Sequence, residues 1–144
     1  MIIKPFLLFF PILFNMLTPD TGWQSDKIQV LSKSIVKIME MNPDILEPEG
    51  LKISQCQIFV EENSFVKGLN TLEANNKKVC IRDKGILFQL SVGPYLTITD
   101  LQIGNSSASI AIELGSFNMY DPSLSEGSFV FKLSKTDGEW NVIN

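Results

Sequence analysis

The spacing of apolar residues changes twice along this chain of 144 residues. Residues 5–17 form a nearly unbroken apolar run, and residues 25–41 carry apolar side chains at intervals of three and four. From residue 51 onward, apolar and polar residues tend to alternate. Intervals of three and four line one face of a helix, whereas alternation lines one face of a strand. The pattern therefore predicts a leader, then one helix, then a sheet.

The helix is predicted to run from Ser25, whose side chain can cap the first turn, to about Met41. Pro43 follows, and proline cannot continue the hydrogen-bond ladder of a helix. The apolar face of the predicted helix comprises Ile28, Leu31, Ile35, Ile38 and Met39. Such a stripe is expected to pack against a sheet of the same chain.

The alternating part of the chain predicts antiparallel strands and a closing hairpin that turns at Asp137-Gly138. The segment 63–77 is polar and is expected to be a loop, with Asn75-Asn76 as turn formers. The fold class is accordingly α+β, with one N-terminal amphipathic helix packed on a curved antiparallel sheet of about six strands. The segments predicted as strands before that hairpin are 51–61, 78–83, 86–92, 95–103 and 108–119.

One of the predicted hairpins joins segments 78–83 and 86–92 across Asp83-Lys84-Gly85. In its second arm the apolar residues stand at every other position, so one face is expected to point inward. The residues of that row are Ile86, Phe88, Leu90 and Val92.

Residues 1–22 have the layout of a secretory signal peptide or a short membrane anchor, and residues 23–144 form a single α+β domain. Lys4 is the only charge before the apolar run, which is shorter than the roughly 20 residues of a membrane-spanning helix. Gly22 offers a small residue at a cleavage point. The protein is expected to be periplasmic or secreted, with a membrane tether only through an uncleaved N-terminal segment.

Composition excludes several classes of function. The chain has a net charge of −4 and no basic cluster, so binding to nucleic acid is not expected. It contains no histidine, which excludes hydrolases with a histidine base and zinc sites with histidine ligands. No metal site and no cofactor is predicted.

Cys56 and Cys80 are the two cysteines of the chain. In an oxidising compartment they would close a loop of about 25 residues, worth roughly 3 kcal/mol in the chain-entropy description. Strand parity places Cys56 with Ile58 but Cys80 opposite Val79 and Ile81, so the two thiols share a face only if the alternation is interrupted. A disulfide and two separate buried thiols both remain open.

The closing segment alternates aromatic residues, turns at a Lys/Asp/Gly sequence and continues as Trp-x-Val. The residues that carry this pattern are Phe129, Phe131, Lys135, Asp137, Gly138, Trp140 and Val142. It resembles the last hairpin of NTF2-like domains, which are cones of a curved sheet wrapped around helices. The resemblance implies a pocket at the mouth of the cone, and some relatives are isomerases that use an aspartate base.

Asp100 is the candidate catalytic residue within that resemblance. Alternation slips at Thr99-Asp100, and a β-bulge at this position could aim the carboxylate into a pocket or could only bend the sheet. Tyr95 and Tyr120 are candidate ligand-binding residues that could donate hydroxyl hydrogen bonds to the same ligand.

The predicted function is a non-enzymatic binding module for a small apolar ligand or a protein partner. One alternative is an NTF2-like isomerase or hydratase that uses an aspartate base in a cone pocket. A second alternative is a small lipocalin-like carrier, although Gly22 and Trp23 are adjacent and do not form the Gly-x-Trp pattern of such carriers.

Overall fold

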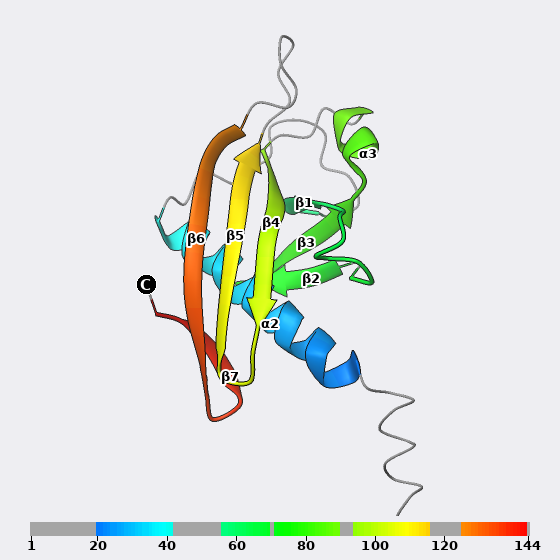
Figure 1. Ribbon diagram of the computed structural model, residues 1–144. Helices are drawn as coiled ribbons and strands as arrows, with labels where there is room; N and C mark the ends of the chain where they lie inside the picture. Colours follow the sequence, from blue (N-terminus) through cyan, green and yellow to red (C-terminus); the bar gives the residue numbers. More distant parts are fainter. Residues whose placement is uncertain (1–19, 42–55, 70, 90–93, 116–124, 144) are drawn as a thin grey trace, which may run out of the picture.

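The computed structural model describes residues 20–41, 56–69, 71–89, 94–115 and 125–143 (Figure 1). The predicted leader therefore lies outside the described residues up to residue 19. None of the helices in the described part of the chain combines the length and the apolar character needed to cross a membrane. The helices are α2 (Asp20–Met41) and α3 (Lys84–Gln89); the strands are β1 (Ile58–Glu61), β2 (Thr71–Ala74), β3 (Lys77–Arg82), β4 (Tyr95–Ile103), β5 (Ser107–Gly115), β6 (Ser125–Thr136) and β7 (Glu139–Val142).

The seven strands form one curled, mixed sheet with the order β2-β3-β1-β4-β5-β6-β7. Strand β1 runs parallel to both neighbours, β3 and β4, and the other pairs are antiparallel. The α+β class is confirmed. The prediction of about six strands, all antiparallel, is wrong in number because the predicted loop 63–77 contains β2. It is wrong in direction because β1 is parallel to both of its neighbours. The helix also begins at Asp20 rather than at the N-terminus of the chain.

Strand β2 was not predicted because it has only four residues and lies within a longer polar segment. It pairs with β3 through a tight turn at Asn75 and Asn76, whose φ angles of 53° and 65° lie in the left-handed region that asparagine tolerates. The prediction of a turn there is confirmed. Before β2, the side chain of Asn63 accepts the Phe65 N–H at 3.0 Å and tightens the loop after β1. This loop leads to β2, and β3 then runs between β2 and β1, antiparallel to β2 and parallel to β1.

Helix α2 crosses behind the sheet and starts five residues before the predicted cap at Ser25 (Figure 1). Four of the five residues of the predicted stripe are buried as expected, and only Ile28, at 37%, is exposed. Lys27 and Ser34 are buried in addition. Ser34 tolerates burial because its hydroxyl donates to the Val30 carbonyl at 2.7 Å. Burial lowers the pKa of Lys27 from its ordinary value. The predicted apolar stripe is therefore confirmed except at Ile28, and the buried side of the helix also includes two polar residues.

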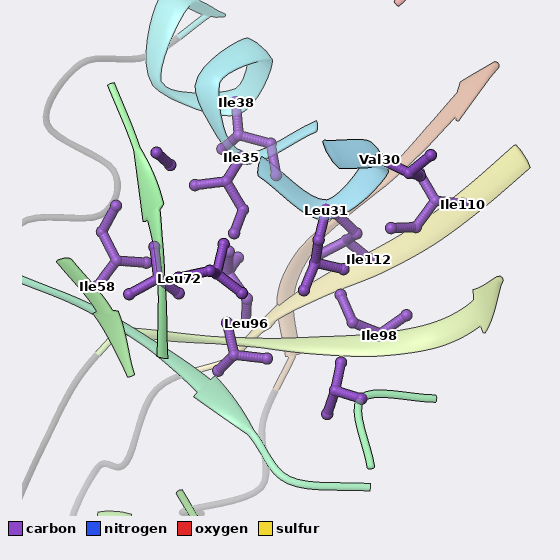
Figure 2. Close-up of a cluster of buried hydrophobic side chains, with 14 of the residues drawn as sticks. Val30, Leu31, Ile35, Ile38, Ile58, Leu72, Leu96, Ile98, Ile110 and Ile112 are labelled. Atoms are coloured by element: carbon purple, nitrogen blue, oxygen red, sulfur yellow. The ribbon is translucent and has the colours of Figure 1, made fainter. Parts of the chain in front are cut away.

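The main core lies between α2 and the inner face of the sheet, which is the face turned toward this helix. Figure 2 shows side chains of α2 meeting side chains of β1, β2, β4 and β5 in this core. Burial of such aliphatic side chains contributes about 1.5–3 kcal/mol each, so this layer dominates stability. The labelled side chains are Val30, Leu31, Ile35, Ile38, Ile58, Leu72, Leu96, Ile98, Ile110 and Ile112.

Helix α3 stands where the second arm of a hairpin was predicted. Asp83 caps it, because its carboxylate accepts the Gly85 N–H at 2.9 Å and its carbonyl accepts the Leu87 N–H at 3.0 Å. Leu87 is fully buried, whereas Ile86 and Phe88 are 44% and 53% exposed. The predicted inward row is therefore wrong at Ile86 and Phe88. Its other two residues, Leu90 and Val92, lie outside the described residues.

The closing hairpin matches its prediction and is tied to the start of the fold. Strands β6 and β7 turn at Asp137 and Gly138, whose φ angles of 54° and 79° suit a two-residue hairpin loop. The buried indole of Trp140 donates its Nε1–H to Asp26 of α2 at 3.0 Å. Lys135 lies 3.1 Å from the same carboxylate oxygen. These contacts hold the closing hairpin against α2.

Candidate functional site

A second, smaller cluster lies on the outer face of the sheet, which is the face turned away from α2. This disulfide cluster consists of Cys56, Phe59, Cys80, Leu87 and Tyr95. In β1, and in β4 before its register shift, the odd-numbered positions point to this face, because Val60, Leu96 and Ile98 belong to the main core. Helix α3 covers the cluster by inserting Leu87. The outer face is therefore partly buried at the end where α3 lies.

Cys56 and Cys80 form a disulfide with a Cα–Cα distance of 5.8 Å. The parity conflict is resolved because Cys56 precedes β1 and so escapes the alternation of that strand. Phe59 is the register partner of Cys80, which brings the bonded sulfurs beside its ring in one cluster. A disulfide of this kind is typical of an oxidising, extracytoplasmic environment.

Tyr95 is 4% exposed and lies over Gly115, its partner on β5. A Cβ atom at Gly115 would come within 2.8 Å of the tyrosine ring, so only glycine leaves room for it. Burial, followed by the negative charges of Glu61 and Glu113, raises the pKa of the Tyr95 hydroxyl above its ordinary value of 10.0. The hydroxyl thus stays protonated at neutral pH and can act as a donor.

Polar residues continue the outer face beside Tyr95. Thr97 donates its hydroxyl to Glu61 at 2.7 Å, and Thr97 is the register partner of Glu113. Arg82 is the register partner of Glu61 on the other side. The result is a cross-strand row of polar side chains from β3 to β5, of which the Glu113 carboxylate is the most open to solvent. This row borders the apolar disulfide cluster.

The structure places Asp100 apart from this cluster. The predicted irregularity of β4 is confirmed, because the β4–β5 register shifts between Ile98 and Asp100. At this bulge the Ile98 carbonyl accepts a hydrogen bond from the Asn63 amide at 2.8 Å, so the bulge anchors the loop after β1. The Asp100 side chain is exposed and lies 3.4 Å from the Gln102 amide. A catalytic role for Asp100 stays a prediction.

Of the predicted site residues, the structure brings Tyr95, Cys56 and Cys80 together and leaves Asp100 about 16 Å away from Tyr95 along β4, at about 3.3 Å per residue. Tyr120 lies outside the described residues. Sequence reasoning missed Phe59, Leu87, Glu61, Thr97 and Glu113. The alternation of Phe59-Val60-Glu61 was a usable signal, because it separates Phe59 and Glu61 from the core residue between them.

Two shallow hollows lie elsewhere. One of about 530 Å³ lies at the β4–β5 turn and is bordered by Gln102, Lys132 and Ile143. The other, of about 260 Å³, lies between α2 and β7 and is bordered by Lys33 and Asn141. Neither gathers the residues predicted as a site. Among the described residues, no group of three or more acidic or cysteine side chains could hold a metal ion.

Comparison of the chain with protein-family models, with curated proteins and with solved structures finds no match. The resemblance to NTF2-like domains therefore stays a prediction. The outer face between α3 and β5 is the candidate functional site on its own geometry, since it joins a buried disulfide, a buried tyrosine and exposed apolar side chains.

Proposed function

We propose that this protein is an exported, non-enzymatic module that binds another protein through the outer face between α3 and β5. The observation that carries the proposal is the exposure of Ile86 and Phe88 on α3, at 44% and 53%, directly beside the disulfide cluster. The two side chains flank the buried Leu87 on either side of the helix, and exposed large apolar side chains of this kind can mark interaction sites. The leader-like segment 1–22 and the disulfide support an extracytoplasmic location.

Helix α3 is held firmly in place, which favours a role in binding. Helix α3 has only six residues, yet it is capped by Asp83 and anchored by the fully buried Leu87. Leu87 in turn packs in the cluster that contains the disulfide. A pre-organised surface loses less conformational entropy when a partner binds, so more of the contact energy appears as affinity.

The charge beside α3 indicates the chemistry of the partner. Glu113 is exposed on β5 and lies close enough to Tyr95 to raise the pKa of its hydroxyl. A partner segment that covers Ile86 and Phe88 with apolar side chains would place a lysine or arginine favourably near Glu113. We therefore propose a protein partner with an apolar segment flanked by positive charge.

Photo-crosslinking in the compartment where the protein resides tests this proposal. A photoreactive amino acid is placed at Phe88 in the full chain, and at Met41 as a control, because Met41 is similarly exposed at 58% but lies on α2. The adduct formed from position 88 identifies the partner, and the purified partner is then titrated against variants. Phe88→Ser should weaken binding roughly fourfold to tenfold, because burying a half-exposed phenylalanine contributes about half of the 1.5–3 kcal/mol for a full side chain.

The control variant and the charge variant sharpen the test. Met41→Ser should leave the dissociation constant within about twofold, and Glu113→Gln should weaken binding less at high salt than at low salt. Crosslinks of equal yield from positions 41 and 88, or equal affinities of the Phe88→Ser and Met41→Ser variants, would refute the proposed site.

A further inference from the structure

The Cys56–Cys80 disulfide lies on the outer face of the sheet but is closed off from solvent. Cys56 is 2% exposed and Cys80 is fully buried. The other members of the disulfide cluster are Phe59, Leu87 and Tyr95. Reduction requires a thiolate to attack one of the two sulfurs directly, so its rate depends on access to them. A dissolved thiol therefore reaches the disulfide only after part of the cluster has moved away.

Most of the disulfide cluster belongs to strands that are paired with their neighbours. Cys80 lies on β3, which pairs with β2 on one side and with β1 on the other. Phe59 lies on β1 between β3 and β4, and Tyr95 pairs with Gly115 of β5. Moving any of these residues away would break hydrogen bonds of the sheet. The strands can therefore expose the disulfide only if the sheet itself opens.

Helix α3 contributes to the cluster from outside the sheet, and Figure 1 shows it beyond the end of β3. Of its six residues, Leu87 is buried and the other five are exposed. The Asp83 carboxylate accepts the Gly85 N–H at 2.9 Å, but this bond caps the helix and does not fasten it to the sheet. Segments with few buried apolar contacts open locally at a lower free energy than the whole fold. Withdrawal of Leu87 is therefore the least costly way to expose the sulfurs.

We propose that α3 is a lid that controls reduction of the Cys56–Cys80 disulfide. When α3 opens, Leu87 leaves the cluster and one thiolate of a dithiol reductant attacks one of the sulfurs. The S–S bond breaks, its electron pair stays on the other cysteine sulfur, and a mixed disulfide joins the reductant to the protein. The second thiolate of the reductant then displaces the protein sulfur, so the reductant is oxidised to its own disulfide and both cysteines are left reduced.

The lid separates the lifetime of the disulfide from the stability of the rest of the fold. Unfolding of the whole domain would also expose the sulfurs, but it requires the main core between α2 and the sheet to come apart. Opening of α3 leaves that core intact, so the rate of reduction follows the fraction of folded molecules in which α3 is open. This inference concerns the protein alone and does not depend on the proposed binding partner.

Reduction of the folded full chain by dithiothreitol, in a non-ionic detergent that accommodates residues 5–17, tests the proposal. Samples are alkylated at timed intervals, and mass spectrometry gives the reduced fraction. Leu87→Ala should be reduced at least tenfold faster than the wild type, because it removes most of the apolar contact that closes the lid. Asp83→Ala, which removes the helix cap, should be reduced about threefold to tenfold faster. Gln89→Ala shortens an exposed side chain of the same helix and, as the matched control, should stay within about twofold of the wild type.

Asp26→Ala distinguishes opening of the lid from unfolding of the whole domain. Asp26 binds the indole of Trp140 on the face of the sheet opposite α3, so its loss should destabilise the fold without affecting the lid. The reduction rate should then stay within about twofold of the wild type, whereas reduction through global unfolding would become at least tenfold faster. Asp83→Ala decides the question if Leu87→Ala does not fold. Wild-type rates for both lid variants, or an acceleration by Asp26→Ala as large as that by the lid variants, would overturn the proposal.

Discussion

The contact between Asp26 and Trp140 should contribute strongly to the free energy of unfolding of the domain. Trp140 is fully buried, and its indole N–H donates to the Asp26 carboxylate at 3.0 Å. The ammonium of Lys135 lies 3.1 Å from the same oxygen and 5.8 Å from the centre of the indole ring system. Replacing Asp26 by alanine removes the acceptor of the indole and the counter-charge of the lysine in one step.

The expected cost follows from these two losses. A buried donor left without its acceptor costs about 1–3 kcal/mol. The ion pair contributes about 0.5–1 kcal/mol, because the side chains of Lys135 and Asp26 are 30% and 23% exposed and are therefore screened by water. Asp26→Ala should lower the free energy of unfolding by about 2–4 kcal/mol, or the Tm by roughly 8–16 °C for a domain of this size.

The pH dependence separates the charge from the hydrogen bond. Donation from Trp140, followed by the hydrogen bond and charge of Lys135, lowers the pKa of Asp26 from its ordinary value. A carboxyl with a lowered pKa in the folded state contributes stability that is present above the unfolded pKa of about 3.9 and is lost as the pH falls through the folded pKa. Asp26→Asn should therefore differ from the wild type near pH 7, and the difference should shrink below about pH 4.

Urea unfolding followed by tryptophan fluorescence measures both effects. The matched control is Glu139→Ala, which removes the Lys33–Glu139 ion pair at 2.9 Å between the same helix and the same hairpin. That pair is exposed, so its loss should leave the unfolding midpoint nearly unchanged. If Asp26→Ala were no more harmful than Glu139→Ala, the importance assigned to the buried indole contact would be wrong.

Three further predictions concern the outer face. Gly115→Ala should cost about 1–3 kcal/mol in thermal unfolding, because the added Cβ displaces the buried Tyr95 ring, and the cost should largely disappear in a Tyr95→Leu background. Replacing Cys56 and Cys80 by serine should lower the free energy of unfolding by about 3 kcal/mol in urea titrations under oxidising conditions, with no difference from the reduced wild type. Because the pKa of Tyr95 is raised in the folded state, the contribution of the protonated hydroxyl to stability is present below about pH 10 and is lost as the pH rises further. In unfolding curves recorded at alkaline pH, Tyr95→Phe should therefore lose less stability with rising pH than the wild type.

The parts of the fold that the sequence predicted are those with strong local signals. The existence of α2, the irregularity of β4 at Asp100 and the Asp137-Gly138 turn each depend on residues close together in the chain. Strand β2, helix α3 and the parallel pairing of β1 depend on distant contacts. Leu87, for example, is buried because the disulfide cluster receives it, although alternation alone favoured Ile86 and Phe88 as the inward residues.

The candidate site was predictable in part for the same reason. Tyr95 and the two cysteines stood out by residue type, and the structure unites them. Glu61 and Glu113 are ordinary surface carboxylates in the sequence, and only the sheet order places them on either side of Thr97. No local pattern could reveal this arrangement, because it joins strands that lie some fifty residues apart in the chain.

The contact between α2 and the closing hairpin also limits when the fold can form. Asp26 and Trp140 are 114 residues apart, so a growing chain lacks this contact until β7 has been made. A chain without Trp140 leaves one end of α2 without its buried partner, and the main core open at that side. For a protein that is exported, as proposed, late closure would keep the chain loosely folded while it is being synthesised. It would thus arrive at the membrane in a form that can still be threaded through a narrow pore.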